Sequence, residues 1–160
     1  MGEGNSNVSV HGYGRLVVMD PDGNLKSDTG WIKNNFTNAG KVACAGKMSG
    51  ADTPAVFDYV AVGTDNTAAS DTDTTLSSEI VDSGLARAID ASPSLSSTNV
   101  ASDTMEINKS WSVTGTKTVQ EIACFNSSAD GDMIGRTVVS PSVAVVSGDT
   151  LNGTYKVIFA

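Results

Sequence analysis

The sequence predicts a mainly all-β fold, namely an antiparallel β-sandwich with one or two short helices. Jelly-roll connections between the strands are one option for this sandwich. Short runs of alternating apolar and polar residues recur along the chain, with turn residues between them. Gly, Ser, Thr, Asp and Asn are abundant while aromatic residues make up only 6%, a balance typical of short strands and many turns. The 160 residues suit one domain with its own core. We expect a polar arm over residues 1–7 and a single sandwich domain over residues 8–160.

The first predicted element is a β-hairpin. Residues 8–19 alternate as a strand does, and the DPDGN sequence at 20–24 supplies a turn, because proline presets φ and glycine accepts positive φ. The chain is expected to return as a strand over residues 25–36, with Trp31 as its large apolar anchor in the core.

A helix is predicted next. Thr37 or Asn38 provides an N-cap, and the Ala- and Lys-rich interior ends near Gly50. Val42, Ala45 and Met48 recur at helical spacing and form one apolar stripe. We expect this stripe to pack across one end of the sheets.

The stretch from 56 to 87 is the most unusual part of the chain. It opens with a strand over residues 56–62 and continues as a long polar excursion. Asp73 is placed to cap a short helix through Leu76 and Ile80, and a strand is expected over residues 85–89. The Ser-rich residues 91–103 are read as a loop or a weak edge strand.

The C-terminal half predicts consecutive strands over residues 105–113, 119–126, 133–139 and 151–159. Turns are expected at residues 114–117, 127–132 and 147–149, and Pro141 indicates a sheet edge or a bend. The last strand is expected to be central in its sheet, because an unpaired terminal strand would fray. The expected inward stripe of that strand is Leu151, Tyr155, Val157 and Phe159, and the expected core includes Val60, Trp111, Ile122 and Tyr155.

Charge restricts the classes of partner. The formal net charge is -8, with ten basic residues spread along the chain, so we expect neither nucleic acid nor an anionic membrane surface as a partner. The N-terminal residues lack the basic and apolar regions of a signal peptide. No apolar run approaches the length of a membrane span.

Candidate catalytic and metal-binding residues each have a simpler structural interpretation. His11 is the one histidine, in the first strand, and Cys44 and Cys124 are expected to be free. Asp71, Asp73 and Glu79 lie among Ala, Ser and Thr, without the aromatic residues of a glycosidase cleft. The acidic turns lack the EF-hand pattern, although weak calcium binding by clustered oxygens stays open. Trp31 and Trp111 would suit a sugar platform if exposed, but core positions are favoured. We expect no enzyme activity, no cofactor and no bound metal.

Five segments, in their order along the chain, carry a resemblance to known proteins. They are TNAGKVACAG (37–46), YVAVGTDNTAASDTDTTLSSEI (59–80), GLAR (84–87), INKSWSVTGTKTVQEIACFN (107–126) and VVSGDTLNGTYKV (145–157). Together they resemble small virion structural proteins of tailed bacteriophages, most closely capsid decoration (cement) proteins. Asp65-Asn66 replaces a glycine-threonine pair of that pattern.

The resemblance implies a β-sandwich protein on the capsid surface of a virion, made in the host cytoplasm. It would bind the outside of the assembled capsid and stabilise contacts between major capsid subunits, as a homo-oligomer, dimer or trimer. The alternative is a tail, baseplate or fibre module that binds a host-surface glycan. The candidate subunit-contact residues are in the polar excursion: Gly63, Thr64, Asp65, Asn66, Ala68, Ala69 and Asp71.

Overall fold

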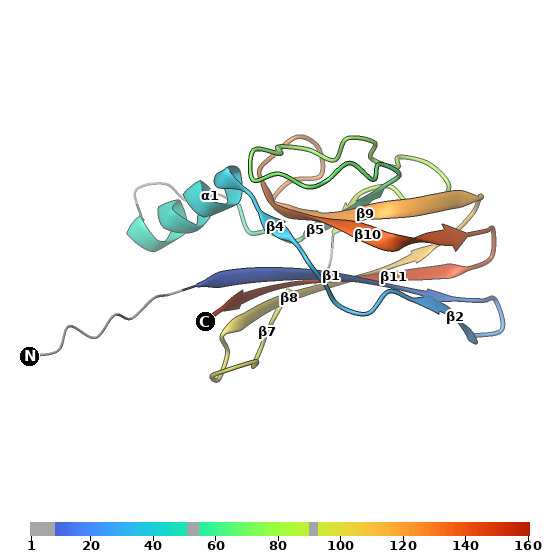
Figure 1. The fold of residues 1–160 in the computed structure, drawn as a ribbon, viewed down its shortest axis with the longest axis horizontal. Coiled ribbons are helices and arrows are strands. Elements are labelled where there is room, and N and C mark those ends of the chain that lie inside the picture. Colours follow the sequence, from blue (N-terminus) through green and yellow to red (C-terminus); the bar gives the residue numbers. More distant parts are fainter. Residues whose placement is uncertain (1–8, 51–54, 90–92) are drawn as a thin grey trace, which may run out of the picture.

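The computed structural model describes residues 9–50, 55–89 and 93–160, which form two antiparallel sheets packed face to face with one helix at one end (Figure 1). The predicted all-β sandwich is therefore confirmed. The predicted arm over residues 1–7 lies outside the described residues. The elements in chain order are β1 (Val10–Met19), β2 (Leu25–Asp28), β3 (Ile32–Lys33), β4 (Asn35–Phe36), α1 (Asn38–Ser49), β5 (Tyr59–Gly63), β6 (Ala88–Ile89), β7 (Ser94–Ser96), β8 (Thr104–Ser112), β9 (Lys117–Phe125), β10 (Met133–Val145) and β11 (Thr150–Phe159).

The first sheet has the order β2-β1-β11-β8-β7, and β3 also pairs with β1. The last strand, β11, lies between β1 and β8 and is paired along its whole length, as predicted. The second sheet has the order β4-β10-β9-β5-β6. Its β10–β9 register shifts between Val138 and Val143, so the pairing is irregular around Pro141, where an edge or a bend was predicted. Jelly-roll connectivity stays a prediction.

The core lies between the two sheets. The four predicted core residues Val60, Trp111, Ile122 and Tyr155 are at most 4% exposed. Of the stripe expected in the last strand, Leu151, Tyr155 and Val157 are buried, whereas Phe159 is 40% exposed at the end of β11. The main cluster of buried side chains draws on both sheets, and burial of apolar area on this scale is the main stabilising term of such a fold.

The segment predicted as one strand over residues 25–36 is instead three short strands shared between the sheets. β2 and β3 pair with β1, whereas β4 pairs with β10 in the other sheet. Between β2 and β3 the chain turns at Gly30, whose φ is +64°, and Trp31 is 44% exposed. The predicted core position of Trp31 is wrong, because this segment crosses from one sheet to the other outside the core.

Helix α1 has the predicted caps but buries a different face. Thr37 Oγ1 accepts a hydrogen bond from the Gly40 backbone N–H at 2.9 Å, and Gly50 ends the helix in the left-handed region. Gly40 and Ala43 are the buried helix residues. A Cβ at Gly40 would lie 2.6 Å from the Ile134 carbonyl oxygen, so the helix approaches β10 most closely at its smallest residue. The predicted packing of Val42, Ala45 and Met48 is wrong: all three are exposed, Met48 by 85%.

The polar excursion contains no helix between Asp73 and Ile80, so that prediction is wrong. Residues 64 to 79, here called the 64–79 loop, instead run as turns and bends over the outer face of the second sheet (Figure 1). The strand expected over residues 85–89 is reduced to β6, and β7 is the weak edge strand expected within residues 91–103. In this loop, ion pairs with Arg136 and Arg87 take the place of local helical hydrogen bonds.

Candidate functional site

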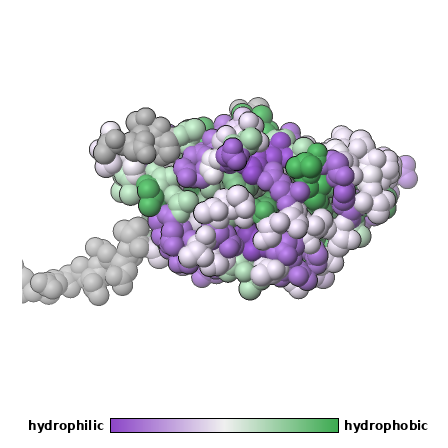
Figure 2. Space-filling view, turned by 90° about the horizontal axis from the view of Figure 1, so that it is seen from above, coloured by the Kyte–Doolittle hydropathy of each residue, from purple (hydrophilic) through white to green (hydrophobic). Residues whose placement is uncertain are grey.

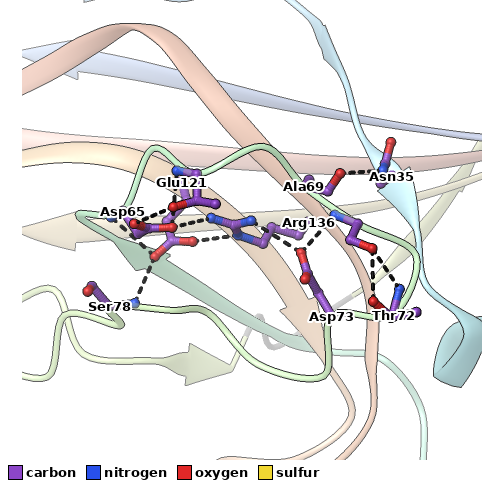
Figure 3. A network of polar contacts seen from close by, with 10 residues as sticks. Asn35, Asp65, Ala69, Thr72, Asp73, Ser78, Glu121 and Arg136 are labelled. Carbon is purple, nitrogen blue, oxygen red and sulfur yellow. Dashed lines mark hydrogen bonds and ion pairs between the residues drawn. The ribbon is translucent and has the colours of Figure 1, made fainter.

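Arg136 fixes the 64–79 loop to the second sheet (Figure 3). Its guanidinium, 1% exposed, donates to Glu121 on β9 at 2.6 Å, to Asp65 at 2.9 Å and to Asp73 at 3.2 Å. Glu121 Oε1 also accepts from the backbone N–H groups of Asp65, at 3.4 Å, and Ser78, at 3.2 Å. One buried ion cluster therefore holds both ends of the loop.

The electrostatics of this cluster favour the charged forms of Arg136 and Asp65. Burial lowers the pKa of Arg136, but its hydrogen bond to Glu121 and the nearby carboxylates raise that pKa above its ordinary value. For the acidic Asp65, burial acts in the opposite direction and raises the pKa. Hydrogen bonds from Thr67 and the charge of Arg136 outweigh burial and bring the pKa of Asp65 below its ordinary value. The group is a structural ion cluster, because the guanidinium is directly bonded to all three carboxylates.

Arg87 forms a second anchor at the far end of the loop. It donates to both carboxylate oxygens of Glu79, at 2.9 and 2.6 Å, and to the carbonyl oxygens of Ser127 and Asp130 in the β9–β10 hairpin. Its guanidinium also lies 3.5 Å from the ring centroid of Phe125. Beneath the loop, a small apolar cluster consists of Ala61, Leu76, Ala123, Phe125 and Met133, with Tyr59 packed against it.

The candidate subunit-contact residues divide into two groups. Gly63 is buried at the end of β5, where a Cβ would collide with Glu121 Oε1, and Asp65 is bound to Arg136. The rest are exposed or half-buried along the loop: Thr64, Asn66, Ala68, Ala69 and Asp71. Contact between them and a partner stays a prediction.

The tip of the 64–79 loop lies beside the start of α1. Asn35 donates to the Ala69 carbonyl oxygen at 2.6 Å, and the Asn38 N–H donates to the Asp71 carbonyl oxygen at 2.7 Å. Lys41 and Asp71 form an exposed ion pair at 3.7 Å. Seen from above, hydrophilic residues cover much of the loop face, and hydrophobic residues reach the surface near the α1 end (Figure 2).

An apolar groove runs between α1 and the ends of β1 and β11. This α1 groove has a volume of about 720 Å³ and is lined by Val10, Phe36, Lys41, Cys44, Ala45, Met48, Ser49 and Phe159. A second hollow of about 320 Å³ shares Cys44, Met48 and Phe159 with it and adds Val56 and Met105. Because Val56 is 57% and Met48 85% exposed, this end presents apolar side chains to the outside. Sequence reasoning missed the groove by assigning the helix stripe to the core.

A third hollow lies on the outer face of the first sheet, around the exposed Trp31. It has a volume of about 310 Å³ and is lined by Tyr13, Trp31, Thr98, Lys156 and Ile158; we call it the Trp31 hollow. The Lys156 ammonium lies 4.5 Å and the Arg15 guanidinium carbon 5.7 Å from the indole centroid.

The remaining candidate residues have structural contacts. His11 Nε2 lies 3.0 Å from Ser9 Oγ, in the place where the backbones of Ser9 and Ala160 pair. Cys44 and Cys124 are free, as predicted, and burial raises the pKa of both thiols. Asp20 accepts from the backbone N–H groups of Asp22 and Asn24, which is turn chemistry.

Over the described residues, no group of three or more His, Cys, Asp and Glu side chains is placed to hold a metal ion. Within the same residues, no helix combines the length and the hydrophobicity of a membrane span.

No protein-family model matches this chain, and no curated protein matches its sequence significantly. The resemblance to phage virion proteins therefore stays a prediction, and a function has to be argued from the geometry.

Proposed function

We propose that this protein is a capsid decoration protein, which binds the outer surface of an assembled phage capsid and stabilises the contacts between major capsid subunits. The observation that supports the proposal best is the α1 groove, with Met48, Val56 and Phe159 exposed at one end of the sandwich. Contiguous exposed apolar surface of this kind marks interaction sites on soluble proteins.

The charges around the groove suit an acidic partner surface. Lys41 lines the α1 groove and Lys47 the adjoining hollow, and α1 carries no acidic residue. The chain as a whole is acidic, with a net charge of -8. A positively charged rim on a negative protein would orient this end toward acidic capsid loops and keep the other faces away from them.

The 64–79 loop offers a second contact at the same end. Its tip is hydrogen-bonded to Asn35 in β4 and to Asn38 at the start of α1, so Asn66 and Ala68 are displayed on a rigid support. A pre-organised loop loses little conformational entropy on binding. The contact surface we propose therefore combines the α1 groove with the exposed tip of the loop.

Decoration needs no strong individual contact. Protein that binds only the assembled lattice stabilises it by mass action, and many copies, or linked copies in a dimer or trimer, make modest contacts effective. Self-association is expected because such sites lie on or near symmetry axes of the particle.

A reconstitution experiment tests this proposal. Purified protein is added to particles assembled without it, and bound protein is measured by co-sedimentation. Met48→Glu is expected to weaken binding about tenfold or more, because it places a charge in an apolar contact. Leu25→Glu is the matched control, since Leu25 is also exposed, by 61%, and lies in β2 at the opposite end (Figure 1). Equal binding of the two variants, or no binding by the unaltered protein, would contradict the proposal.

One observation favours the second candidate, a tail, baseplate or fibre module that binds a host-surface glycan. Such a module presents aromatic side chains at its surface, and Trp31 is exposed beside Tyr13. The α1 groove has no role in that alternative, so we rank it second.

A further inference from the structure

We infer that the Trp31 hollow is a binding site for a neutral saccharide. The inference goes beyond capsid decoration, and it holds whether or not the chain binds a capsid. It begins with the position of the indole. Trp31 is 44% exposed on the outer face of the first sheet, although an aromatic ring of this size is ordinarily placed where most of its area is buried. The exposed part of the indole is suited to stack on the C–H groups of a sugar ring.

The side chains under and beside the ring hold it in one orientation. Arg15 and Lys156 extend from the neighbouring strands β1 and β11, and both cations lie over the ring. Arg15 is itself held by Asp28, with Nε 2.9 Å from Oδ1, and Lys156 by Glu106 at 2.9 Å. Because these partners restrict the cations, the indole is supported before a ligand arrives, which reduces the entropy lost on binding.

The same groups supply hydrogen-bonding atoms of both kinds. Arg15 and Lys156 are donors, and the carboxylates of Asp28 and Glu106 are acceptors. Glu106 also accepts from Ser96 and Asn108 at 3.2 Å, while Thr98 lines the hollow. Donors and acceptors arranged around an aromatic face match the hydroxyl groups around the apolar face of a hexose.

Charge balance points to a neutral ligand. The two cations at the ring and the two carboxylates that pair with them sum to zero, since each cation is paired with one carboxylate. An anionic glycan would have to displace those carboxylates and approach a protein of net charge -8. A neutral saccharide would neither displace the carboxylates nor be repelled by the net negative charge.

The size and polarity of the hollow favour a saccharide over a protein. Its volume of about 310 Å³ is at the lower end of the range for small-ligand pockets, roughly 300–1,000 Å³. A stable protein interface covers about 800 Å² on each partner and has an apolar centre. Here both cations at the indole belong to ion pairs, whereas the α1 groove has the apolar character that a protein contact needs.

Affinity electrophoresis of the full chain tests the inference, with dextran, mannan or galactan as the neutral polysaccharide in the gel. We expect at least one of them to retard the protein, and Trp31→Ala to weaken that binding about tenfold. Trp31→Phe is expected to keep part of the affinity, because it keeps an aromatic face. Leu25→Ala is the matched control, since it removes exposed apolar area from the nearby strand β2, outside the hollow. Fluorescence of the buried Trp111, whose Nε1 donates to the Ala86 carbonyl oxygen, verifies that each variant is folded.

Three results would overturn the inference. The first is no retardation by any of the three polysaccharides. The second is equal retardation of Trp31→Ala and the unaltered protein. The third is binding only to heparin beads, which would identify the ligand as an anionic glycan. Loss of particle binding by Met48→Glu has no bearing on these results, so the saccharide site and the capsid proposal fail separately.

Discussion

Arg136 is the residue on which the structure of the 64–79 loop depends most. Its guanidinium neutralises a fully buried Glu121 and binds two aspartates that lie far from it in sequence. A buried ion pair of this kind contributes little net stability compared with apolar residues, but removing one partner leaves an uncompensated buried charge. The cluster therefore specifies where the loop lies on the sheet.

Replacing Arg136 tests that role. Arg136→Met is expected to lower the free energy of unfolding by about 3–5 kcal/mol, measured by urea denaturation, because Glu121 is left charged and buried. Arg15→Met is the matched control: Arg15 pairs with Asp28 at the surface, and the expected loss is about 1 kcal/mol or less. The double variant Arg136→Met, Glu121→Leu should recover part of the stability. A cost for Arg136→Met no greater than for Arg15→Met would contradict the assignment.

Asp103 makes stability depend on pH in the acid range. Its carboxylate accepts backbone N–H groups of Val100, Thr98 and Asn99 at 2.7–2.9 Å, and these hydrogen bonds hold its pKa well below the usual range. The pKa of Asp28 is lowered to about 2, first by its hydrogen bond with Arg15. A carboxyl whose pKa is lower in the folded protein stabilises it above the unfolded-state pKa, about 3.9, and loses that contribution as pH falls.

The free energy of unfolding is therefore expected to decrease as pH is lowered from about 4 toward 2. Asp103→Asn is expected to be less stable at pH 7 and to show a shallower decrease, so the two curves should converge in acid. Urea denaturation at a series of pH values measures both curves. A constant difference between them over the whole range would show that the Asp103 hydrogen bonds do not depend on its charge.

At the scale of elements, the 64–79 loop has a structural side and an exposed side. Leu76 is 5% exposed and packs in the small apolar cluster under the loop, whereas Ala68 is exposed at the tip. The loop therefore behaves as a folded layer of the domain with a surface free for contacts.

Two substitutions within this one loop distinguish its sides. Leu76→Ala is expected to reduce the free energy of unfolding by about 2–5 kcal/mol, because it empties part of an apolar cluster. Ala68→Lys is expected to change it by no more than about 0.5 kcal/mol, while weakening binding to particles in the co-sedimentation assay. If Ala68→Lys unfolds the domain, the tip belongs to the core and is no contact surface.

Elements whose signals are local were predictable from the sequence. The cap at Thr37, the end of α1 at Gly50 and the turn at residues 20–24 depend on neighbouring residues alone. Trp31 was placed wrongly because alternation does not show where a chain leaves one sheet for the other. The stripe of α1 was misread for a related reason: the buried face is set by the close approach of Gly40 to β10, a contact between distant segments.

The candidate site was the least predictable part. The partners of Arg136 come from residues 65, 73 and 121, and no short-range pattern connects them. Asp73 was predicted to cap a helix, and that prediction was wrong. Its carboxylate instead binds the Arg136 guanidinium. Excess negative charge and polar composition correctly indicated where the loop begins. The residues that anchor the loop could be identified only from the three-dimensional structure.

At the scale of the whole molecule, the capsid proposal rests on three features: the α1 groove, the anchored 64–79 loop and the acidic net charge. Decoration of a capsid requires many such molecules on each particle, whereas a tail, baseplate or fibre module is present in few copies. Copy number is therefore the property that separates the two.

The most direct test is to quantify this chain against the major capsid protein in purified virions by mass spectrometry with isotope-labelled peptides. Decoration predicts on the order of hundreds of copies per particle. A value in the tens or fewer would contradict the capsid proposal and favour the tail module.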